Sequence, residues 1–413
     1  MTIAEKIMAR ASGKKKVLPN EIVMARVDVA MSHENADVVL RSFRDIGINK
    51  VWDNERIVIL FDHRVPADSE RTAITHRRLR KFVKEQQLKY FYDQKEGICH
   101  QILAEFGHDL PGEVLVGTDS HTTTHGAFGT FAAGIGATEM AGVWATGELW
   151  LRVPETIRID ITGEFKPFVC AKDLILYIIG KIGADGADYK SVEFHGHTTT
   201  QMSIASRMVL SNLSMEMGAK VAFVPPDDKT ITYLKHRAIR KFEVVLPDKD
   251  AHYIKKLNID VSDLSSQVAC PHSVDNVKRV SEMVGKKIDQ ALIGSCTNGR
   301  LEDLAIAAKI LENRTVHPDT RLLIIPASRR TYLDALRKGF LEIFVRAGGL
   351  VLNPGCGPCL GAHQGLLAPE ETCLATTNSN FKGRMGSSEA FVYLASPATV
   401  AASAIRGEIT EPC

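Results

Sequence analysis

Residues 294–300, Gly-Ser-Cys-Thr-Asn-Gly-Arg, and residues 353–361, Asn-Pro-Gly-Cys-Gly-Pro-Cys-Leu-Gly, place three cysteines in two glycine-rich turns. The spacing of Cys356 and Cys359 allows two thiolates to serve one metal centre, whereas Cys296 reaches the pair only if the fold brings it there. Three thiolates suit a cubane iron–sulfur cluster with one open iron, and an open iron is a Lewis acid. From spacing alone, unrelated buried cysteines are an equally good interpretation.

Length and composition describe a soluble globular chain. The 413 residues suggest two or three domains, and 45% hydrophobic with 24% charged residues is ordinary. The net charge of +2 gives no reason to expect nucleic acid or an anionic membrane as partner. Eight cysteines in a chain of this length suit a reducing compartment. No apolar run approaches the roughly 20 residues of a membrane helix, so we expect a cytoplasmic protein.

Strand and helix patterns predict an α/β fold in three units, 1–153, 154–271 and 272–413, of which the last carries the cysteines. Polar side chains follow the predicted strands closely: Asp62-His63, Asp119-Ser120-His121, Cys296, Cys356-Cys359 and Asn378. Ligands of open α/β sheets bind outside the carboxyl ends of the strands. If the sheets face one another, these side chains therefore converge on one central cleft.

Asp62-His63 and Asp119-Ser120-His121 pair a carboxylate with an imidazole. A carboxylate fixes the tautomer of a histidine and raises its pKa, which makes the histidine a proton donor near neutrality. A capped turn with a surface histidine would be the better interpretation of one such pair, but two pairs at equivalent strand ends favour function. His100 fits a third imidazole of the site and a buried core histidine equally well.

Other polar residues are candidates for supporting roles. Glu193 ends a hydrophobic strand, where a carboxylate is costly unless it is paired or functional. Arg300 and Arg384 follow glycines and could clamp substrate carboxylates, or could lie on a solvated face. Asn298 and Asn378 could donate hydrogen bonds to cluster sulfurs.

Four motifs together resemble the aconitase family, and the resemblance runs from the N-terminus to about residue 408. They are residues 294–300, 356–359, Gly-Thr-Asp-Ser-His-Thr at 117–122 and Asn-Phe-Lys-Gly-Arg at 380–384. The resemblance implies three aconitase-like α/β/α domains around a cluster cleft. The length is similar to that of the large subunits of the two-chain prokaryotic members, in which the swivelling fourth domain is a separate small subunit.

The resemblance also implies an activity and a cofactor. One [4Fe-4S] cluster per subunit would be held by Cys296, Cys356 and Cys359, and the chain would dehydrate and rehydrate a hydroxy acid as a hydro-lyase. The implied catalytic residues are Asp62, His63, His100, Asp119, His121 and Glu193, with His33, Ser120 and Arg384 binding substrate. Within this pattern His63, supported by Asp62, protonates the departing hydroxyl.

The small subunit would supply the catalytic serine, in a heterodimer or heterotetramer. Isopropylmalate is the leading substrate, with homocitrate, homoaconitate and smaller malate-like acids as alternatives. Relatives have arginine where this chain has Ser379, and a Thr-x-Pro-like stretch where it has Asn35-Ala36-Asp37. Both departures fall in the expected substrate region.

Three other functions compete with this interpretation. An RNA-binding regulator of the same fold would need a basic surface, which the near-neutral charge disfavours. A scaffold that keeps only the cluster conflicts with the retained acid–imidazole pairs. A zinc protein would use the same three cysteines.

Overall fold

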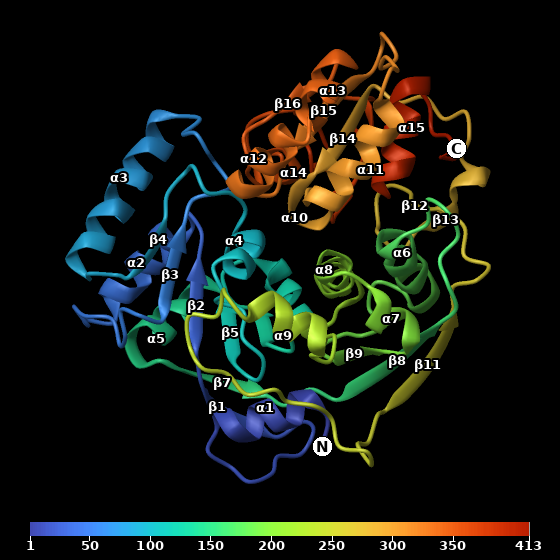
Figure 1. Cartoon of the computed structure of the whole chain (residues 1–413). Coiled ribbons are helices and arrows are strands. Elements are labelled where there is room, and N and C mark those ends of the chain that lie inside the picture. The colour runs from blue at the N-terminus through green and yellow to red at the C-terminus, as the bar shows by residue number, and fades with distance from the viewer. Residues whose placement is uncertain (413) are drawn as a thin grey trace.

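The computed structural model describes residues 1–412 and contains three multi-stranded α/β units and one small β-ribbon (Figure 1). The first sheet has five parallel strands in the order β4-β3-β2-β5-β6. These are β2 (Val29–Ser32), β3 (Ile57–Leu60), β4 (Tyr90–Tyr92), β5 (Val114–Gly117) and β6 (Phe131–Gly134). Most of their residues are buried, as runs of Val, Ile and Leu in a parallel sheet require.

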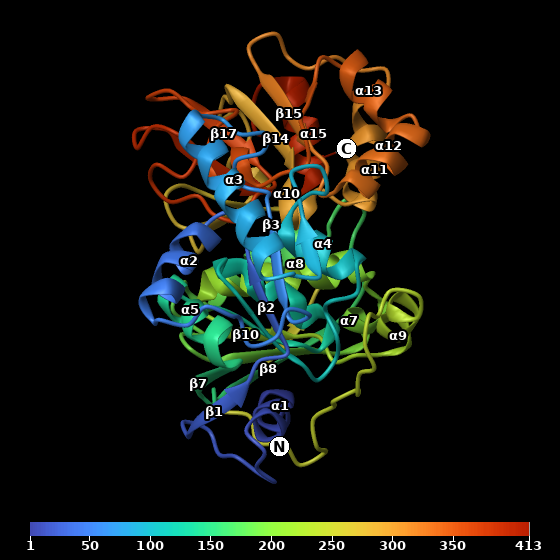
Figure 2. The ribbon, with the colours of Figure 1, turned by 90° about the vertical axis from the view of Figure 1, so that its left-hand side faces the viewer.

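Helices α2 (Ala36–Asp45), α3 (Glu70–Glu85), α4 (Cys99–Glu105), α5 (Ala137–Thr146) and the 3₁₀ segment η1 (Ser120–Phe128) belong to this unit. Phe43, Phe82 and Trp144 pack together between the helices. An antiparallel ribbon of β1 (Ile22–Arg26) and β7 (Glu148–Arg152) and the first helix, α1 (Ile3–Ala11), lie at the far end of the molecule (Figures 1 and 2).

The second sheet has four parallel strands in the order β10-β9-β8-β11. They are β8 (Thr156–Thr162), β9 (Ser191–His195), β10 (Val221–Phe223) and β11 (Lys255–Asp260). The accompanying helices are α6 (Ala171–Ile182), α7 (His197–Gln201), α8 (Ile204–Leu213), η2 (Ser214–Met217) and α9 (Asp228–Leu234).

The third sheet has seven strands in the order β13-β12-β18-β17-β14-β15-β16. They are β12 (Gln267–Ala269), β13 (Val277–Arg279), β14 (Gln290–Gly294), β15 (Arg321–Ile325), β16 (Leu350–Val351), β17 (Thr372–Ala375) and β18 (Phe391–Ala395). Its helices are η3 (Val280–Glu282), α10 (Ser295–Asn298), α11 (Leu301–Leu311), α12 (Arg329–Arg337), α13 (Phe340–Arg346), α14 (Gly357–Leu360) and α15 (Pro397–Arg406).

The three sheets follow the three predicted segments closely. The first and second sheets fall inside 1–153 and 154–271, but the third begins with β12 at Gln267, before the expected division at 271. The division of the chain into three domains stays a prediction.

The carboxyl ends of the first and third sheets face each other. In both views α10, which follows β14, lies directly above α4 and α8 (Figures 1 and 2). The second sheet differs from this arrangement, because it contributes to the centre through α6, α8 and η2 and not through the end of β9. Within residues 1–412, no helix combines the length and the apolar character needed to cross a bilayer.

Candidate active site

Two tight turns bring the three predicted cysteines to the centre of the molecule. Cys296 lies in α10, just after Gly294, which has a φ of 142°. A Cβ on Gly294 would lie 2.1 Å from the carbonyl oxygen of Ile325, so only glycine fits this turn. Cys356 follows β16, and its N–H donates to the carbonyl oxygen of Asp62 at 2.6 Å. This bond ties the second cysteine turn to the end of β3 in the opposite sheet.

All three thiols are buried, and amide or guanidinium groups contact the sulfurs of Cys296 and Cys359. Asn212 Nδ2 lies 3.4 Å from Cys296 Sγ. The Asn378 amide spans two cysteines: its Nδ2 is 3.6 Å from Cys296 Sγ, and its Oδ1 is 3.4 Å from Cys359 Sγ. Arg384 Nη2 donates to Cys359 Sγ at 3.6 Å. A hydrogen bond from the Cys356 thiol, followed by the charge of Arg384, holds the pKa of Cys359 well below its usual range.

These donors fit an iron–sulfur cluster better than a single ion. Thiolates around one zinc lie about 3.8 Å apart, given tetrahedral Zn–S bonds of ~2.3 Å. Within residues 1–412, the one set of three or more metal-ligating side chains whose ligand atoms all lie within 4.8 Å contains no cysteine. The three cysteines are therefore not gathered as a mononuclear site, and amide donors beside the sulfurs suit the charge of a larger cluster.

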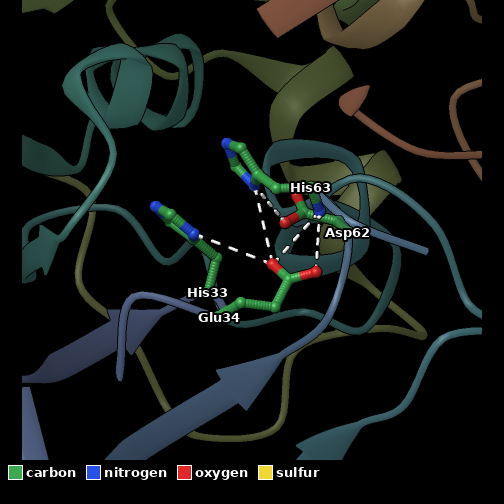
Figure 3. Close-up of side chains that lie close together, drawn as sticks. All are labelled: His33, Glu34, Asp62 and His63. Carbon is green, nitrogen blue, oxygen red and sulfur yellow. Dashed lines mark hydrogen bonds and ion pairs between the residues drawn. The ribbon is translucent and has the colours of Figure 1, made fainter. Parts of the chain in front are cut away.

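The close set of ligand-type side chains consists of His33, Glu34, Asp62 and His63 (Figure 3). The His33 and His63 rings stack, with centroids 3.9 Å apart. Both Glu34 oxygens already accept backbone N–H groups, from His63 at 3.0 and 3.1 Å and from Arg64 at 2.9 Å. These bonds account for the buried Glu34 carboxylate without an ion, so the set positions the His63 loop.

His63 is arranged as a charged imidazole. Its Nδ1 lies 2.6 Å from Asp62 Oδ1, and its Nε2 lies 3.5 Å from Asp119 Oδ2. Burial alone would lower the pKa of His63, but the charge of Asp62 and the hydrogen bond with Asp119 raise it well above the usual range. His63 is therefore protonated at neutral pH and can give up a proton in the cleft.

Asp119 connects three histidines at the end of β5. Its Oδ1 lies 3.0 Å from His100 Nε2 and accepts the backbone N–H of His121 at 2.7 Å. Burial would raise the pKa of Asp119, but its histidine neighbours, His100 first, hold it well below the usual range. Ser120, the other polar residue of this turn, is exposed and has its Oγ 3.2 Å from His121 Nδ1.

Glu216 in η2 completes this group, and the sequence interpretation missed it. Its Oε1 lies 3.0 Å from His121 Nε2 and accepts a hydrogen bond from the Ser379 hydroxyl. Burial would lower the pKa of His121, but Asp119 and Glu216 raise it to about 9. Burial would likewise raise the pKa of Glu216, which His121 instead lowers. The only sequence signal was an acidic residue three positions after the end of α8.

Lys172 at the start of α6 is a second missed residue. Its side chain is fully buried, and Nζ donates to the carbonyl oxygens of Thr376 and Thr377 at 3.0 and 2.5 Å. Burial lowers the pKa of Lys172 to about 8, against the opposing influence of the Cys359 thiolate. Lys172 thus fixes the backbone just before Asn378 and places a cation beside the cysteines.

Glu193 lies apart from these residues, contrary to the expectation from its strand-end position. Its Oε1 accepts the Ile3 N–H at 2.8 Å, and its Oε2 contacts the Tyr253 hydroxyl and His195 Nε2, both at 2.9 Å. Because Ile3 begins α1, at the far end of the molecule, Glu193 anchors the N-terminal helix. These contacts correct the assignment of Glu193 to the cleft.

Two further candidates bind the protein rather than the cysteine sulfurs. Asn298 Nδ2 donates to Asp303 at 2.9 Å. Arg300 donates to the carbonyl oxygens of Cys296 and Thr297 at 2.6 and 2.7 Å and to Gln101 at 2.9 Å. Both therefore shape the turn that carries Cys296.

A pocket of about 490 Å³ opens beside His33 and His63. Its lining includes Leu360, next to Cys359, and three arginines, Arg41, Arg64 and Arg71. Asp37, from the stretch that departs from the family pattern, also lines it and pairs with Arg41 and Arg78 at 2.7 and 2.5 Å.

Facing α/β sheets with a cysteine triad and acid–imidazole pairs between them define the aconitase class of architecture. The family model described as "Aconitase family (aconitate hydratase)" matches residues 5–407, and the chain belongs to the aconitase family. The chain is 57% identical over 413 residues to a protein of Methanothermobacter thermautotrophicus named "Probable 3-isopropylmalate dehydratase large subunit", covering 100% of this chain and 99% of the relative.

A second protein of Methanothermobacter thermautotrophicus, named "Probable methanogen homoaconitase large subunit", is 52% identical over 417 residues, covering 100% of this chain and 97% of the relative. Among solved structures, Thermococcus kodakaraensis aconitase X in its holo-form matches with a TM-score of 0.51 at 13% identity, over 89% of this chain and 88% of that one. That likeness supports the α/β fold.

Proposed function

We propose that this chain is the large subunit of an iron–sulfur hydro-lyase that isomerises a hydroxy acid, with 3-isopropylmalate as substrate. One observation carries the proposal: Cys296, Cys356 and Cys359 meet the Asp62–His63 and Asp119–His121 groups between facing sheets. The name of the relative with 57% identity supports the choice of substrate.

Members of the aconitase family generally hold a [4Fe-4S] cluster, and in this chain Cys296, Cys356 and Cys359 would hold it. The bound cluster supplies a Lewis acid for the hydroxyl and carboxylate oxygens of a substrate. Asn378, Asn212 and Arg384 donate to the sulfurs from the protein side.

The chain's own residues handle the protons. His63, kept charged by Asp62 and Asp119, donates a proton to the departing hydroxyl oxygen. Glu216 remains anionic at neutral pH and would accept a proton from water in the rehydration step. Asp119 contacts the rings of His63 and His100 and the backbone N–H of His121, and so holds these three residues together.

Substrate carboxylates would be bound by His33, which lines the arginine-lined pocket, and by Ser120 and Arg384. Relatives have arginine at the position of Ser379, whose hydroxyl donates to Glu216. Because a serine side chain is neutral, it cannot supply the positive charge of that arginine. Restoring arginine at position 379 is therefore expected to change turnover of isopropylmalate or homocitrate, and unchanged kinetics would remove Ser379 from the specificity determinants.

The relatives' names describe large subunits, and this implies a small-subunit partner. On the family pattern, that partner supplies the swivelling domain and the serine that removes the carbon-bound proton, in a heterodimer or heterotetramer in the cytoplasm. The present chain would provide the three α/β domains.

Anaerobic co-expression with the small subunit tests the function. After iron–sulfur reconstitution, absorbance of the alkene product is followed with isopropylmalate, homocitrate and malate-like acids. We expect turnover with isopropylmalate. Turnover of homocitrate alone would favour the homoaconitase alternative. The 52% identity to a protein of that name supports this alternative. Iron binding without any turnover would reduce the chain to a cluster-binding scaffold.

A further inference from the structure

Behind Asp119, a chain of hydrogen-bonded titratable side chains leads away from the cysteines. Asp119 Oδ1 lies 3.0 Å from His100 Nε2. His100 Nδ1 lies 3.3 Å from His125 Nε2, and His125 Nδ1 lies 2.6 Å from Asp109 Oδ2. The first contact belongs to the proposed active site, but nothing in that chemistry uses His125 or Asp109.

Asp109 and His125 lie fully inside the protein. His125 belongs to η1 and Asp109 to the loop between α4 and β5, and both side chains are 0% exposed. Among the described residues, Asp109 Oδ1 has no hydrogen-bond partner. A buried carboxylate with a single hydrogen bond is costly unless that bond comes from a charged group. The position of Asp109 therefore requires a proton shared with His125 beyond that of a neutral imidazole.

Counting protons along the chain leads to the same requirement. The series of side chains from Asp119 to Asp109 contains three hydrogen bonds, and each of them needs one proton. Two neutral imidazoles contribute one N–H each, and two ionised carboxylates contribute none. With only two protons, one pair of acceptors would face each other. All three hydrogen bonds therefore form only when the four side chains hold one proton more than two neutral imidazoles supply.

The direction of the bonds then fixes the state of His100. Burial lowers the pKa of His100, and its histidine neighbours hold the pKa of Asp119 well below its usual range. The extra proton therefore belongs to the Asp109–His125 pair, which is also bonded at 2.6 Å. His125 donates from Nε2 to His100 Nδ1, which leaves His100 Nδ1 unprotonated. His100 consequently carries its own proton on Nε2 and donates it to Asp119.

We propose that His125, which shares a proton with Asp109, is a positioning residue that holds His100 as the neutral Nε2–H tautomer beside Asp119. In that state His100 orients the Asp119 carboxylate toward the cleft without neutralising its charge. The catalytic meaning of this role rests on the proposed hydro-lyase function, whereas the tautomer itself does not.

Few other titratable groups surround the pair. The loop before β5 contributes His108, the β5–η1 segment contributes His121, and Tyr233 of α9 faces Asp109. Burial lowers the pKa of His108 to about 3 and raises that of Tyr233 to about 12. Both are therefore neutral near pH 7, whereas His121 is a further cation near His100.

Nitrogen-15 NMR of histidine side chains tests the proposal on the full-length chain before cluster reconstitution, which avoids paramagnetic broadening. In the wild type, His100 should show a protonated Nε2 and an unprotonated Nδ1 from about pH 6 to about pH 8, close to the ordinary pKa of histidine. A protonated Nδ1, or an imidazolium at His100, overturns the proposal.

His125→Phe keeps a ring in this position but removes the N–H that donates to His100. His100 should then titrate as an imidazolium, and kcat of the reconstituted complex should fall about tenfold at unchanged KM. Asp109→Asn is the conservative partner: the Asn amide donates to His125 Nδ1, so His125 still donates to His100. This variant should keep the wild-type His100 signals.

His108→Phe is the matched control, because His108 is a buried histidine outside the chain with its Nε2 2.7 Å from the Tyr92 hydroxyl. It should leave the His100 signals and kcat unchanged. An effect of His108→Phe equal to that of His125→Phe assigns His125 a purely structural role. If His125→Phe does not fold, the wild-type and Asp109→Asn spectra decide the tautomer. If the His100 spectra are as expected but the reconstituted complex shows no turnover, the hydro-lyase function is contradicted and the assignment of the His100 tautomer is not affected.

Discussion

Glu216 is central to the proton chemistry that we propose for the site, because its carboxylate contacts both the His121 ring and the Ser379 hydroxyl. The pKa shifts of the His121–Glu216 pair are opposite, upward for the imidazole and downward for the carboxyl group. Such a pair is an ion pair at neutral pH, and its charges are held ready for the reaction.

Glu216→Gln should lower kcat at least about 100-fold, the usual contribution of a general acid or base. It should also destabilise the fold in a pH-dependent way. The carboxylate contributes stability above pH ~4.5 that is lost as pH falls through its lowered pKa, and the imidazolium contributes stability below pH ~6.5 that is lost as pH rises through about 9.

Urea unfolding of wild type and Glu216→Gln should therefore differ by about 2 kcal/mol near pH 6 and by much less above pH ~9.5. An equal difference at both pH values would mean that the two side chains are not charged partners. A normal kcat would return Glu216 to a structural role.

At the scale of elements, Glu193 shows how one strand of the second sheet contacts the N-terminal helix. Glu193 lies in the middle of β9, and its carboxylate accepts the first N–H of α1, where the helix dipole also favours a negative charge. Its contacts with Tyr253 and His195 complete a buried anchor for the N-terminal segment.

Glu193→Gln should cost about 1–3 kcal/mol of stability, because the amide nitrogen faces groups that now donate to a carboxylate. The kcat of the reconstituted complex should stay within about twofold, since the variant leaves every contact of the cleft in place. Chemical denaturation and kinetics on one preparation check both values. A large loss of kcat at normal stability would restore Glu193 to the catalytic group.

The contrast between Glu193 and Glu216 shows what sequence patterns could predict. Runs such as 57–60 and 114–117 are buried parallel strands, and their carboxyl ends carry Asp62-His63 and Asp119 as predicted. A carboxylate at a strand end, however, looks the same whether it faces a cleft or caps a helix. Glu216 lies after a helix, in a 3₁₀ turn whose position depends on packing between sheets, so no local pattern distinguishes it.

At the scale of the whole molecule, contacts between protein groups hold the two facing sheets together around the cysteines. Cys356 N–H donates to Asp62, Arg300 to Gln101, and Ser328 to Glu105, at 2.6 to 2.9 Å. The backbone of Ile98 also bonds to Ala327 at 3.0 Å. The cleft should therefore survive loss of a cluster, and only the cysteine turns should loosen.

Anaerobic chelation of the reconstituted chain should leave its circular dichroism unchanged and lower Tm by several degrees, because a ligand that binds only the folded state stabilises it. Hydrogen exchange should rise in residues 294–300 and 354–361 and remain slow in β14 and β3. Cys359→Ala should abolish iron binding, whereas Cys373→Ala, at a cysteine buried within β17, should keep it. Faster exchange throughout the third sheet after chelation would show instead that the cluster, and not the contacts between the sheets, holds the cleft closed.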